Sequence, residues 1–432
     1  MTEFLVALVL LGADDTWPTL EVTEFPQEYL IAPPNSGDNP GEYGNGIVEH
    51  WLMPGSPWIV GQLSEYRAHH HRYERQLGVF AVHRFTREIR FVRMSPQPTN
   101  ESDYNYGPAI PRRPGVCGVS LWYEPWTEEI PSEENFGRGY YKSRLYEWDV
   151  DNGTVEFVKK DWFPLPRLAR FLSDTVLDYL PIVEMPARTW DGTIELTARS
   201  SEKTLRFEID PDGAWAQERW PYVDTQWFAR GPDKASLIVC QSIVSDGDKF
   251  AVECLSPMAR KGHVWSLSVK DIAEELGAEV FELLPPQMPP SSSDPWLVMV
   301  HGLRSREIWI IDRRNGDILR RVDVGTEGHT WCPAASVQGD IVAFADQVTE
   351  GDDHYDMMLR VYRISTGERI GSLDLTLEFG RGLPFAVTDD GHILITDRVT
   401  IWELDPQNDF ASRAIFSLRR LREPEDSVSL KN

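Results

Sequence analysis

Short apolar runs separated by polar corners recur along most of this chain. Three segments share one layout, in which an apolar and aromatic run meets a polar corner ending in Gly and then a second apolar run: RLYEWDVDNGTVEF (144–157), EIWIIDRRNGDILR (307–320) and LRVYRISTGERIGS (359–372). This layout predicts a β-hairpin, because Gly153, Gly316 and Gly367 tolerate the positive φ that a tight corner needs. Further copies lie at 204–217 with Gly213 and at 399–412 with Asn408, and weaker ones at 77–91 and 263–272.

A further apolar run precedes each copy of the hairpin. These runs lie at 57–62, 116–123, 193–198, 236–241, 296–302, 340–347 and 392–397. A sheet of this kind cannot bury both of its faces alone, so such units must stack around an axis. The sequence therefore predicts an all-β fold, a single β-propeller of about seven four-stranded blades. A pair of β-sandwiches is the alternative, but sandwich hairpins have no reason to repeat one turn chemistry.

Helical insertions and the two ends complete the predicted organisation. Apolar residues at helical spacing predict short helices near 168–180 and at 269–276. We expect residues 1–50 to pack on or close the propeller, 51–420 to form it, and 421–432 to be a flexible acidic and polar tail. Ring closure usually joins the two ends of the chain, so we expect residues 4–11 or 20–31 to pair with the sheet that ends near Leu418.

Several of these hairpins resemble those of known propeller families. YEWDVDNG (146–153) looks like the third-strand signature of WD40 repeats, and WIIDRRNGDIL (309–319) and VYRISTGERI (361–370) look like its degenerate forms. The spacing from Asp149 to Gly153 is also similar to quinoprotein-type blades. The resemblance covers most of residues 50–420 and implies a propeller that acts as a binding platform or as an enzyme. The Gly-His pair that opens WD40 units is absent from nearly all copies, and so is the tryptophan that closes quinoprotein repeats.

A more specialised resemblance is to the substrate-recognition half of fungal F-box proteins, which serve ubiquitin ligases. Residues 1–30 are too short for a complete F-box, so this role requires a module that the sequence does not contain.

Charge and cysteine content restrict the partners and the compartment. Lys and Arg total 43 against 68 Asp and Glu, a formal net charge of −25, which repels nucleic acid and anionic membranes and attracts a basic peptide. Four cysteines stand singly without a CxxC pair, which predicts buried thiols and neither a zinc site nor a disulfide framework. The apolar stretch 4–11 is too short to cross a bilayer. We expect a cytoplasmic or nuclear protein.

Candidate binding residues lie in the connections between predicted strands. Trp126, Glu128 and Glu129 share one acidic loop, and Asp352 and Asp353 belong to another. His329 and Arg381, near predicted blade starts, are two further binding candidates. If these loops share a face, an acidic rim with an aromatic anchor suits a protein or basic peptide partner.

Catalytic and metal chemistry has weaker support in the sequence. His69, His70 and His71 are consecutive and therefore point in different directions, which disfavours a metal site. GxSxG, HExxH, P-loop and dinucleotide motifs are absent, so no cofactor is expected. We therefore favour a non-enzymatic interaction platform. The alternative is a propeller enzyme, a lyase, hydrolase or quinone-dependent dehydrogenase, whose axial site would use residues near predicted blade starts: His50, Arg230, His301, His329 and Arg381.

Overall fold

The computed structural model describes most of the chain in separate stretches. These are residues 19–30, 43–53, 55–67, 72–95, 104–106, 110–113, 115–123, 142–160, 183–184, 194–199, 204–209, 226–230, 237–241, 250–255, 263–284, 286, 295–303, 305–325, 329–349, 355–380 and 382–419. Strands dominate these stretches, with the short helices η1 (Gln27–Tyr29), α2 (Val269–Leu276) and α3 (Leu375–Phe379) between them.

The described strands form seven antiparallel sheets, which we number in chain order. The first holds β1 (Thr19–Thr23), β2 (Tyr43–Leu52), β3 (Trp58–Arg67), β4 (Arg72–His83) and β5 (Ile89–Ser95). The second holds β6 (Tyr104–Tyr106), β7 (Ile110–Arg113), β8 (Val116–Tyr123), β9 (Lys142–Asp149) and β10 (Thr154–Lys160). The third holds β11 (Val183–Glu184), β12 (Ile194–Arg199) and β13 (Thr204–Ile209).

The remaining four sheets have four strands each. The fourth holds β14 (Gln226–Arg230), β15 (Leu237–Gln241), β16 (Phe250–Leu255) and β17 (His263–Ser268). The fifth holds β18 (Val280–Leu284), β19 (Trp296–Gly302), β20 (Arg306–Ile311) and β21 (Ile318–Asp323). The sixth holds β22 (His329–Ser336), β23 (Ile341–Thr349), β24 (Tyr355–Arg363) and β25 (Arg369–Asp374), and the seventh β26 (Leu383–Val387), β27 (Ile393–Thr396), β28 (Thr400–Asp405) and β29 (Ala411–Ser417).

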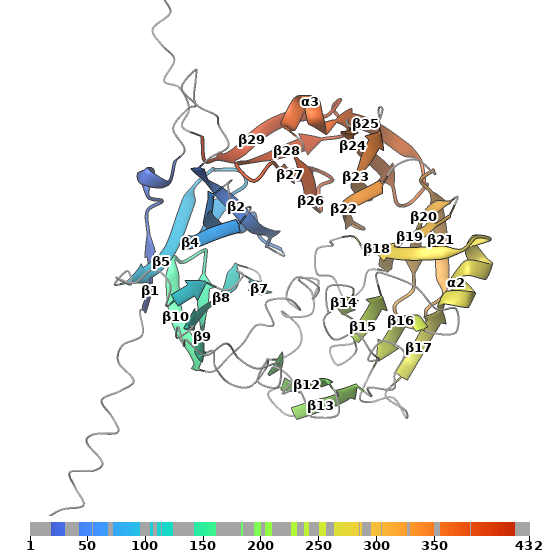
Figure 1. The fold of residues 1–432 in the computed structure, drawn as a ribbon, viewed down its shortest axis with the longest axis horizontal. Coiled ribbons are helices and arrows are strands. Elements are labelled where there is room, and N and C mark those ends of the chain that lie inside the picture. Colours follow the sequence, from blue (N-terminus) through green and yellow to red (C-terminus); the bar gives the residue numbers. More distant parts are fainter. Residues whose placement is uncertain are drawn as a thin grey trace, which may run out of the picture.

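These sheets stand around a common centre, which makes the fold a β-propeller (Figure 1). In the four-stranded sheets the strands follow one another in chain order, so each sheet is a meander whose first strand faces the centre and whose last faces outward (Figure 1). The seven apolar runs predicted to precede the hairpins are all strands.

The predicted glycine corners are confirmed at three hairpins. Gly153, Gly316 and Gly367 have φ of 67°, 78° and 76°, each between two paired strands. The copy at 399–412 is also a hairpin, but there the left-handed residues are Asp409 and Phe410 rather than Asn408. Asn408 instead closes the corner with its backbone, donating from its amide to Asp405 and accepting from Ala411. The corner near Gly213 lies outside the described residues.

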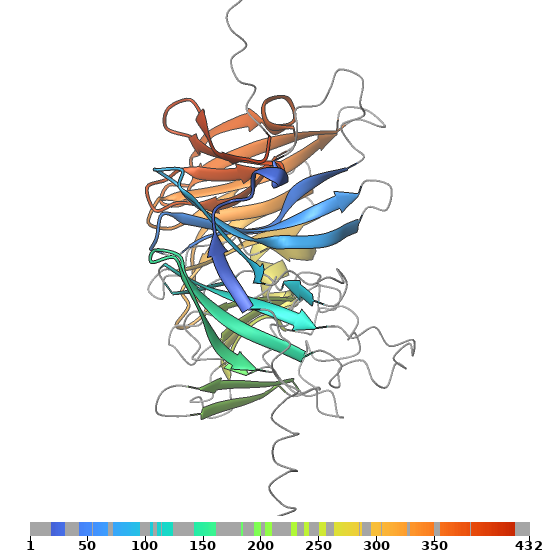
Figure 2. The same cartoon turned by 90° about the vertical axis from the view of Figure 1, so that its left-hand side faces the viewer.

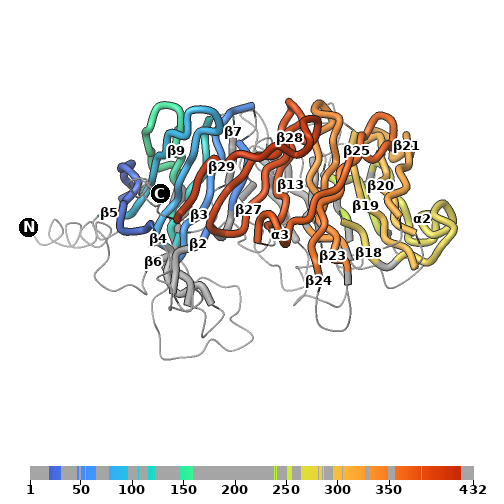
Figure 3. Tube along the Cα trace, turned by 90° about the horizontal axis from the view of Figure 1, so that it is seen from above, coloured from blue at the N-terminus to red at the C-terminus, as the bar shows by residue number. Residues whose placement is uncertain are grey.

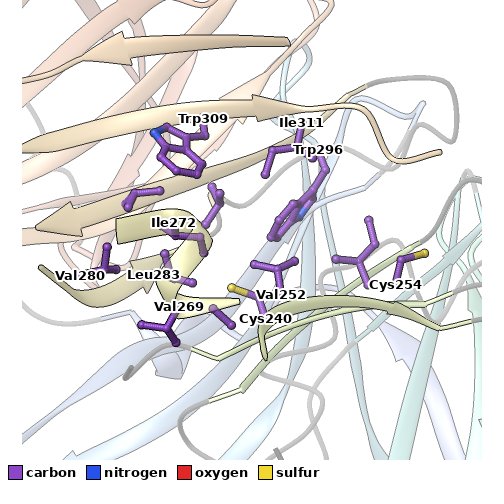
Figure 4. Packing of buried hydrophobic residues seen from close by; sticks show 14 of the residues in the cluster. Cys240, Val252, Cys254, Val269, Ile272, Val280, Leu283, Trp296, Trp309 and Ile311 are labelled. Atoms are coloured by element: carbon purple, nitrogen blue, oxygen red, sulfur yellow. The ribbon is translucent and has the colours of Figure 1, made fainter. Parts of the chain in front are cut away.

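The core consists of apolar side chains between neighbouring sheets. Figure 4 shows one such layer, where Trp296 and Trp309 of the fifth sheet meet Cys240 and Val252 of the fourth. The helix α2 covers this layer with Ile272. Its bounds match the predicted helix at 269–276, whereas the helix predicted near 168–180 lies outside the described residues.

Local hydrogen bonds explain where α2 begins and ends. The side chain of Ser268 accepts a hydrogen bond from the backbone amide of Asp271. The carboxylate of Asp271 accepts one from the backbone amide of Ser268, so both amides have partners in this capping box. Gly277 ends the helix in the left-handed conformation.

Polar side chains join neighbouring sheets as well. Trp265 of the fourth sheet donates from Nε1 to the carbonyl oxygen of Arg313 in the fifth at 2.8 Å. Trp58 of the first sheet donates in the same way to the carboxylate of Asp151 beside the second, at 2.7 Å. These two pairs of sheets are therefore held together by directional bonds in addition to apolar contact.

The closure of the ring differs from the prediction. Within the described part of the chain, no sheet combines strands from both ends. β1 pairs with β5 as a fifth, outermost strand of the first sheet, and not with the sheet that ends near Leu418. β5 has a free edge and is closer to β1 in the sequence than the seventh sheet is. β1 therefore pairs with β5 and becomes part of the first sheet. Residues 4–11, the other predicted partner, lie outside the described residues.

Candidate functional site

Strand direction divides the ring into two faces. In a meander, the turns that join first to second strands and third to fourth strands lie at one end of the sheet. We call this end the turn face; Gly153, Gly316 and Gly367 lie on it. The opposite end carries the links from second to third strands and from each sheet to the next, and we call it the connection face. In Figure 3 the helix α3, which links the sixth sheet to the seventh, lies on the lower side of the ring.

Five of the predicted binding residues fall in the sequence between a second and a third strand of a sheet. Trp126, Glu128 and Glu129 fall between β8 and β9, and Asp352 and Asp353 fall between β23 and β24. All five lie outside the described residues, but the strands that flank them end on this face.

The two remaining candidates precede or begin an innermost strand. His329 is the first residue of β22, of which only the backbone is described, and Arg381 lies outside the described residues just before β26. The structure therefore does not test whether the predicted residues come together, and their role in binding stays a prediction.

Three exposed apolar side chains lie on the connection face, two on neighbouring sheets and one on the helix α3. Leu303, between β19 and β20, is 66% exposed; Trp331, near the start of β22, is 43% exposed; and Leu377, in α3, is 82% exposed. We call these residues the apolar triplet. A single exposed apolar residue is ordinary, but three large ones on the same face of the fifth sheet, the sixth sheet and α3 are typical of a contact surface.

Carboxylates surround the apolar triplet. Those described on the connection face of the fourth to seventh sheets include Glu274, Glu275, Glu279, Asp323, Asp356 and Glu378. Glu274 lies 3.8 Å from Lys270, and Glu275 lies 3.5 Å from Arg321. The other four have no ion-pair partner among the residues that the structure describes, so this part of the face is acidic.

A buried ionic network includes Thr330, the residue next to Trp331. Arg306, the first residue of β20, donates two hydrogen bonds to the carboxylate of Asp346, at 2.7 and 3.0 Å. Thr330, the neighbour of Trp331 in β22, donates to the same carboxylate at 3.0 Å. Arg360 lies on its other side, with Nε 2.5 Å from Asp346 Oδ2. Because Asp346 is fully buried, this network fixes the fifth sheet against the sixth and gives Trp331 a rigid base.

The axial residues of the enzyme hypothesis do not come together where they are described. His50 lies on β2 with its ring edge-on to Phe385 at 4.3 Å, a contact between the innermost strands of the first and seventh sheets. His301 is buried on β19, a second strand of the fifth sheet, with Nδ1 3.4 Å from a carboxylate oxygen of Glu282. The side chain of Arg230 and the whole of Arg381 lie outside the described residues.

Burial controls the chemistry of the other titratable candidates. It lowers the pKa of His50 to about 4, with a smaller contribution from the positive charge of Arg398. Burial also raises the pKa of the Cys240 thiol, which keeps this sulfur protonated and unreactive. Cys117 and Cys254 are buried as well, as predicted for structural thiols.

The described residues show neither a metal site nor a membrane-spanning helix. The described residues contain no group of three or more His, Cys, Asp or Glu side chains placed to hold a metal ion. None of the helices in the described stretches is long and apolar enough to cross a membrane.

Sequence reasoning missed the apolar triplet. Leu303 and Leu377 follow no periodic pattern, and Trp331 belongs to a strand whose other described residues are mostly buried. Their exposure depends on what the neighbouring sheets cover, which no local pattern reveals.

Comparison with known proteins gives similarity in structure alone. No protein-family model matches the chain, and no curated protein matches its sequence. The Cps50 (Swd1) β-propeller domain of Myceliophteria thermophila is 9% identical, with 83% of this chain and 93% of that chain covered and a TM-score of 0.33.

Two further propellers are similar to the same degree. The β-propeller domain of the Trilobed protease from Pyrococcus furiosus is 10% identical over 87% of this chain and 98% of that chain, with a TM-score of 0.40. The Dos1 propeller is 10% identical over 90% of this chain and 88% of that chain, also with a TM-score of 0.40. At these scores the assignment of the fold rests on the sheets described above.

Proposed function

We propose that this chain is a single seven-bladed propeller that acts as a non-enzymatic interaction platform and binds a protein partner through its connection face. The observation that carries the proposal is the apolar triplet, which exposes large apolar side chains on the connection face of the fifth sheet, of the sixth sheet and of the helix α3. Burial of these side chains against a partner removes apolar surface from water, the main source of binding free energy at such surfaces.

The charge of the same face defines the partner. Glu279, Asp323, Asp356 and Glu378 leave an acidic border around the apolar triplet. A partner segment with an aromatic or aliphatic residue between Lys or Arg residues complements both features. Attraction by the net charge of −25 speeds the encounter with such a segment, and added salt slows it.

Rigidity of the surface supports the proposal further. The network of Arg306, Asp346 and Thr330 holds the base of Trp331 in place before any partner arrives. A preorganised aromatic side chain loses little conformational entropy on binding, so it can serve as an anchor.

Selection from a random peptide library, followed by affinity measurement, tests this function. The full chain is immobilised, and we expect the selected sequences to be enriched in Lys and Arg around one aromatic or aliphatic residue. In fluorescence-polarisation titrations with a selected peptide, Trp331→Ala and Leu377→Asp should each weaken binding by about tenfold or more.

The control variant is Leu319→Asp, which changes another exposed leucine, on the outer strand β21. Leu319 is 57% exposed and lies away from the connection face, so this variant should bind as the wild type does. Failure to select any sequence, or equal losses in Leu319→Asp and Leu377→Asp, would overturn the proposal.

A further inference from the structure

The first and seventh sheets meet at a junction that the chain does not cross. Each other pair of neighbouring sheets is connected by the chain that runs from one to the next, and a shared strand commonly joins the two ends of a propeller. In the described residues no strand is shared. Non-covalent contacts alone therefore hold the two sheets together at this junction.

Backbone and aromatic contacts hold the inner part of the junction. The amide of Ile47, on β2, donates to the carbonyl oxygen of Arg398 in the seventh sheet at 2.6 Å. Farther out, the rings of Phe80 and Phe416 are stacked with their centroids 4.8 Å apart. All of these contacts cross from one end of the chain to the other.

A buried group of ion pairs joins the first and seventh sheets at the turn face of the junction. Arg84, next to the end of β4, donates from Nε to Glu403 Oε1 on β28 at 3.0 Å. Its Nη1 and Nη2 donate to the two carboxylate oxygens of Asp390, both at 2.9 Å. The side chains of Arg84 and Glu403 are only 7% and 3% exposed, so this pair is shielded from solvent. Arg413 donates to the second oxygen of Glu403 and neutralises the remaining charge.

The N-terminal segment lies across the outside of the same junction. β1 pairs with β5 from Thr19 opposite Ser95 to Thr23 opposite Phe91. The chain then places Phe25 over the junction, with its ring 5.4 Å from that of Phe91 in the first sheet and 5.6 Å from that of Phe416 in the seventh. Figure 2 shows this dark blue segment running on the outside of the ring from the last sheet (red) toward the second (green).

We propose that residues 19–30 form a strap that closes the ring at this junction and whose release is the first step in opening it. The strap takes the place of the shared strand, since it is hydrogen-bonded to one sheet and inserts Phe25 against both. β1 is only five residues long and pairs along one edge. Short edge elements with few contacts open with small free energies in native proteins.

Hydrogen–deuterium exchange of the full chain under native conditions tests the strap, with Phe25→Ala as the principal variant. We expect the amide of Ile47 and peptides from β29 to exchange faster by about tenfold or more, because loss of the ring uncovers the junction. Peptides from β19 in the fifth sheet should keep their wild-type exchange rates. Glu28→Ala, an exposed position in the same segment, is the matched control and should leave all rates unchanged.

The pattern of exchange decides the outcome. Acceleration confined to the first and seventh sheets supports the strap, whereas equal acceleration in β19 or no acceleration at all overturns it. If Phe25→Ala does not fold, Phe25→Leu provides the same comparison with a smaller effect, because it keeps most of the apolar contact. Acceleration at Ile47 and not at β19 in that variant would again support the strap.

Discussion

Single buried polar residues in this protein depend on contacts that cross from one sheet to another. His50 is the clearest example, because its ring packs against Phe385 of the seventh sheet and Arg398 lies near enough to disfavour a second positive charge. Both effects favour the neutral imidazole in the folded state. His50 therefore contributes to the junction as an aromatic ring and not as a cation.

The pKa of His50 predicts a specific loss of stability in mild acid. It falls from 6.5 in the unfolded chain to about 4 in the folded one, so between these two values the unfolded chain binds more protons. The contribution of His50 to the free energy of unfolding is thus fully present above pH 6.5, and it is lost as the pH falls through this range. Between about pH 7.5 and about pH 5, urea titrations should show a loss about 2 kcal/mol larger in the wild type than in His50→Gln.

His50→Gln serves as its own control for the remaining titratable groups, because it keeps a polar side chain that does not titrate. Identical pH dependence in the two proteins would show that His50 is protonated as easily in the folded state as in the unfolded one.

At the scale of the element, the stability of a hairpin corner depends both on its backbone conformation and on its packing against the neighbouring sheet. Gly316 and Gly367 occupy the same corner in the fifth and sixth sheets, with nearly equal φ of 78° and 76°. Their surroundings differ. A Cβ at Gly316 would lie 2.8 Å from Cε3 of Trp265 in the fourth sheet, whereas a Cβ at Gly367 would meet nothing closer than 3.5 Å.

This difference separates backbone strain from packing. We expect Gly367→Ala to lower the free energy of unfolding by about 1 kcal/mol through strain alone. Gly316→Ala should cost about 2–3 kcal/mol, since it also displaces Trp265 from its hydrogen bond to Arg313. Guanidinium unfolding followed by tryptophan fluorescence measures both values. Equal costs would mean that Trp265 moves aside freely and that it does not fix the fourth sheet to the fifth.

On the scale of the whole molecule, the acidic surface opposes the packing that closes the ring. The formal net charge of the chain is −25, so like charges repel across its surface. Exposed ion pairs such as Arg93 with Glu21, at 3.2 Å, act in the opposite direction but contribute little in water.

Salt should therefore stabilise the protein. Raising the NaCl concentration from about 50 mM to about 500 mM shortens the Debye length several-fold and should raise the Tm by a few degrees. Differential scanning calorimetry measures the shift, and KCl in place of NaCl controls for binding of a particular cation. A Tm that falls with either salt would show that attractive surface pairs outweigh the repulsion.

The sequence by itself determined the features that depend on neighbouring residues. The hairpins at Gly153, Gly316 and Gly367 were predictable because a tight corner needs positive φ within a few residues of two apolar strands. The helix at 269–276 was predictable for the same reason, since its capping box and its left-handed Gly277 are local.

Tertiary structure alone decided the features that join distant parts of the chain. Arg84 and Glu403 are 319 residues apart, and only the closure of the ring brings them together in a buried pair. The same closure places Phe25 between Phe91 and Phe416. The exposure of Trp331 likewise depends on how the sheets pack around it. Local patterns carry no information about such contacts, because the free energy that selects them arises from surfaces that meet only in the assembled ring.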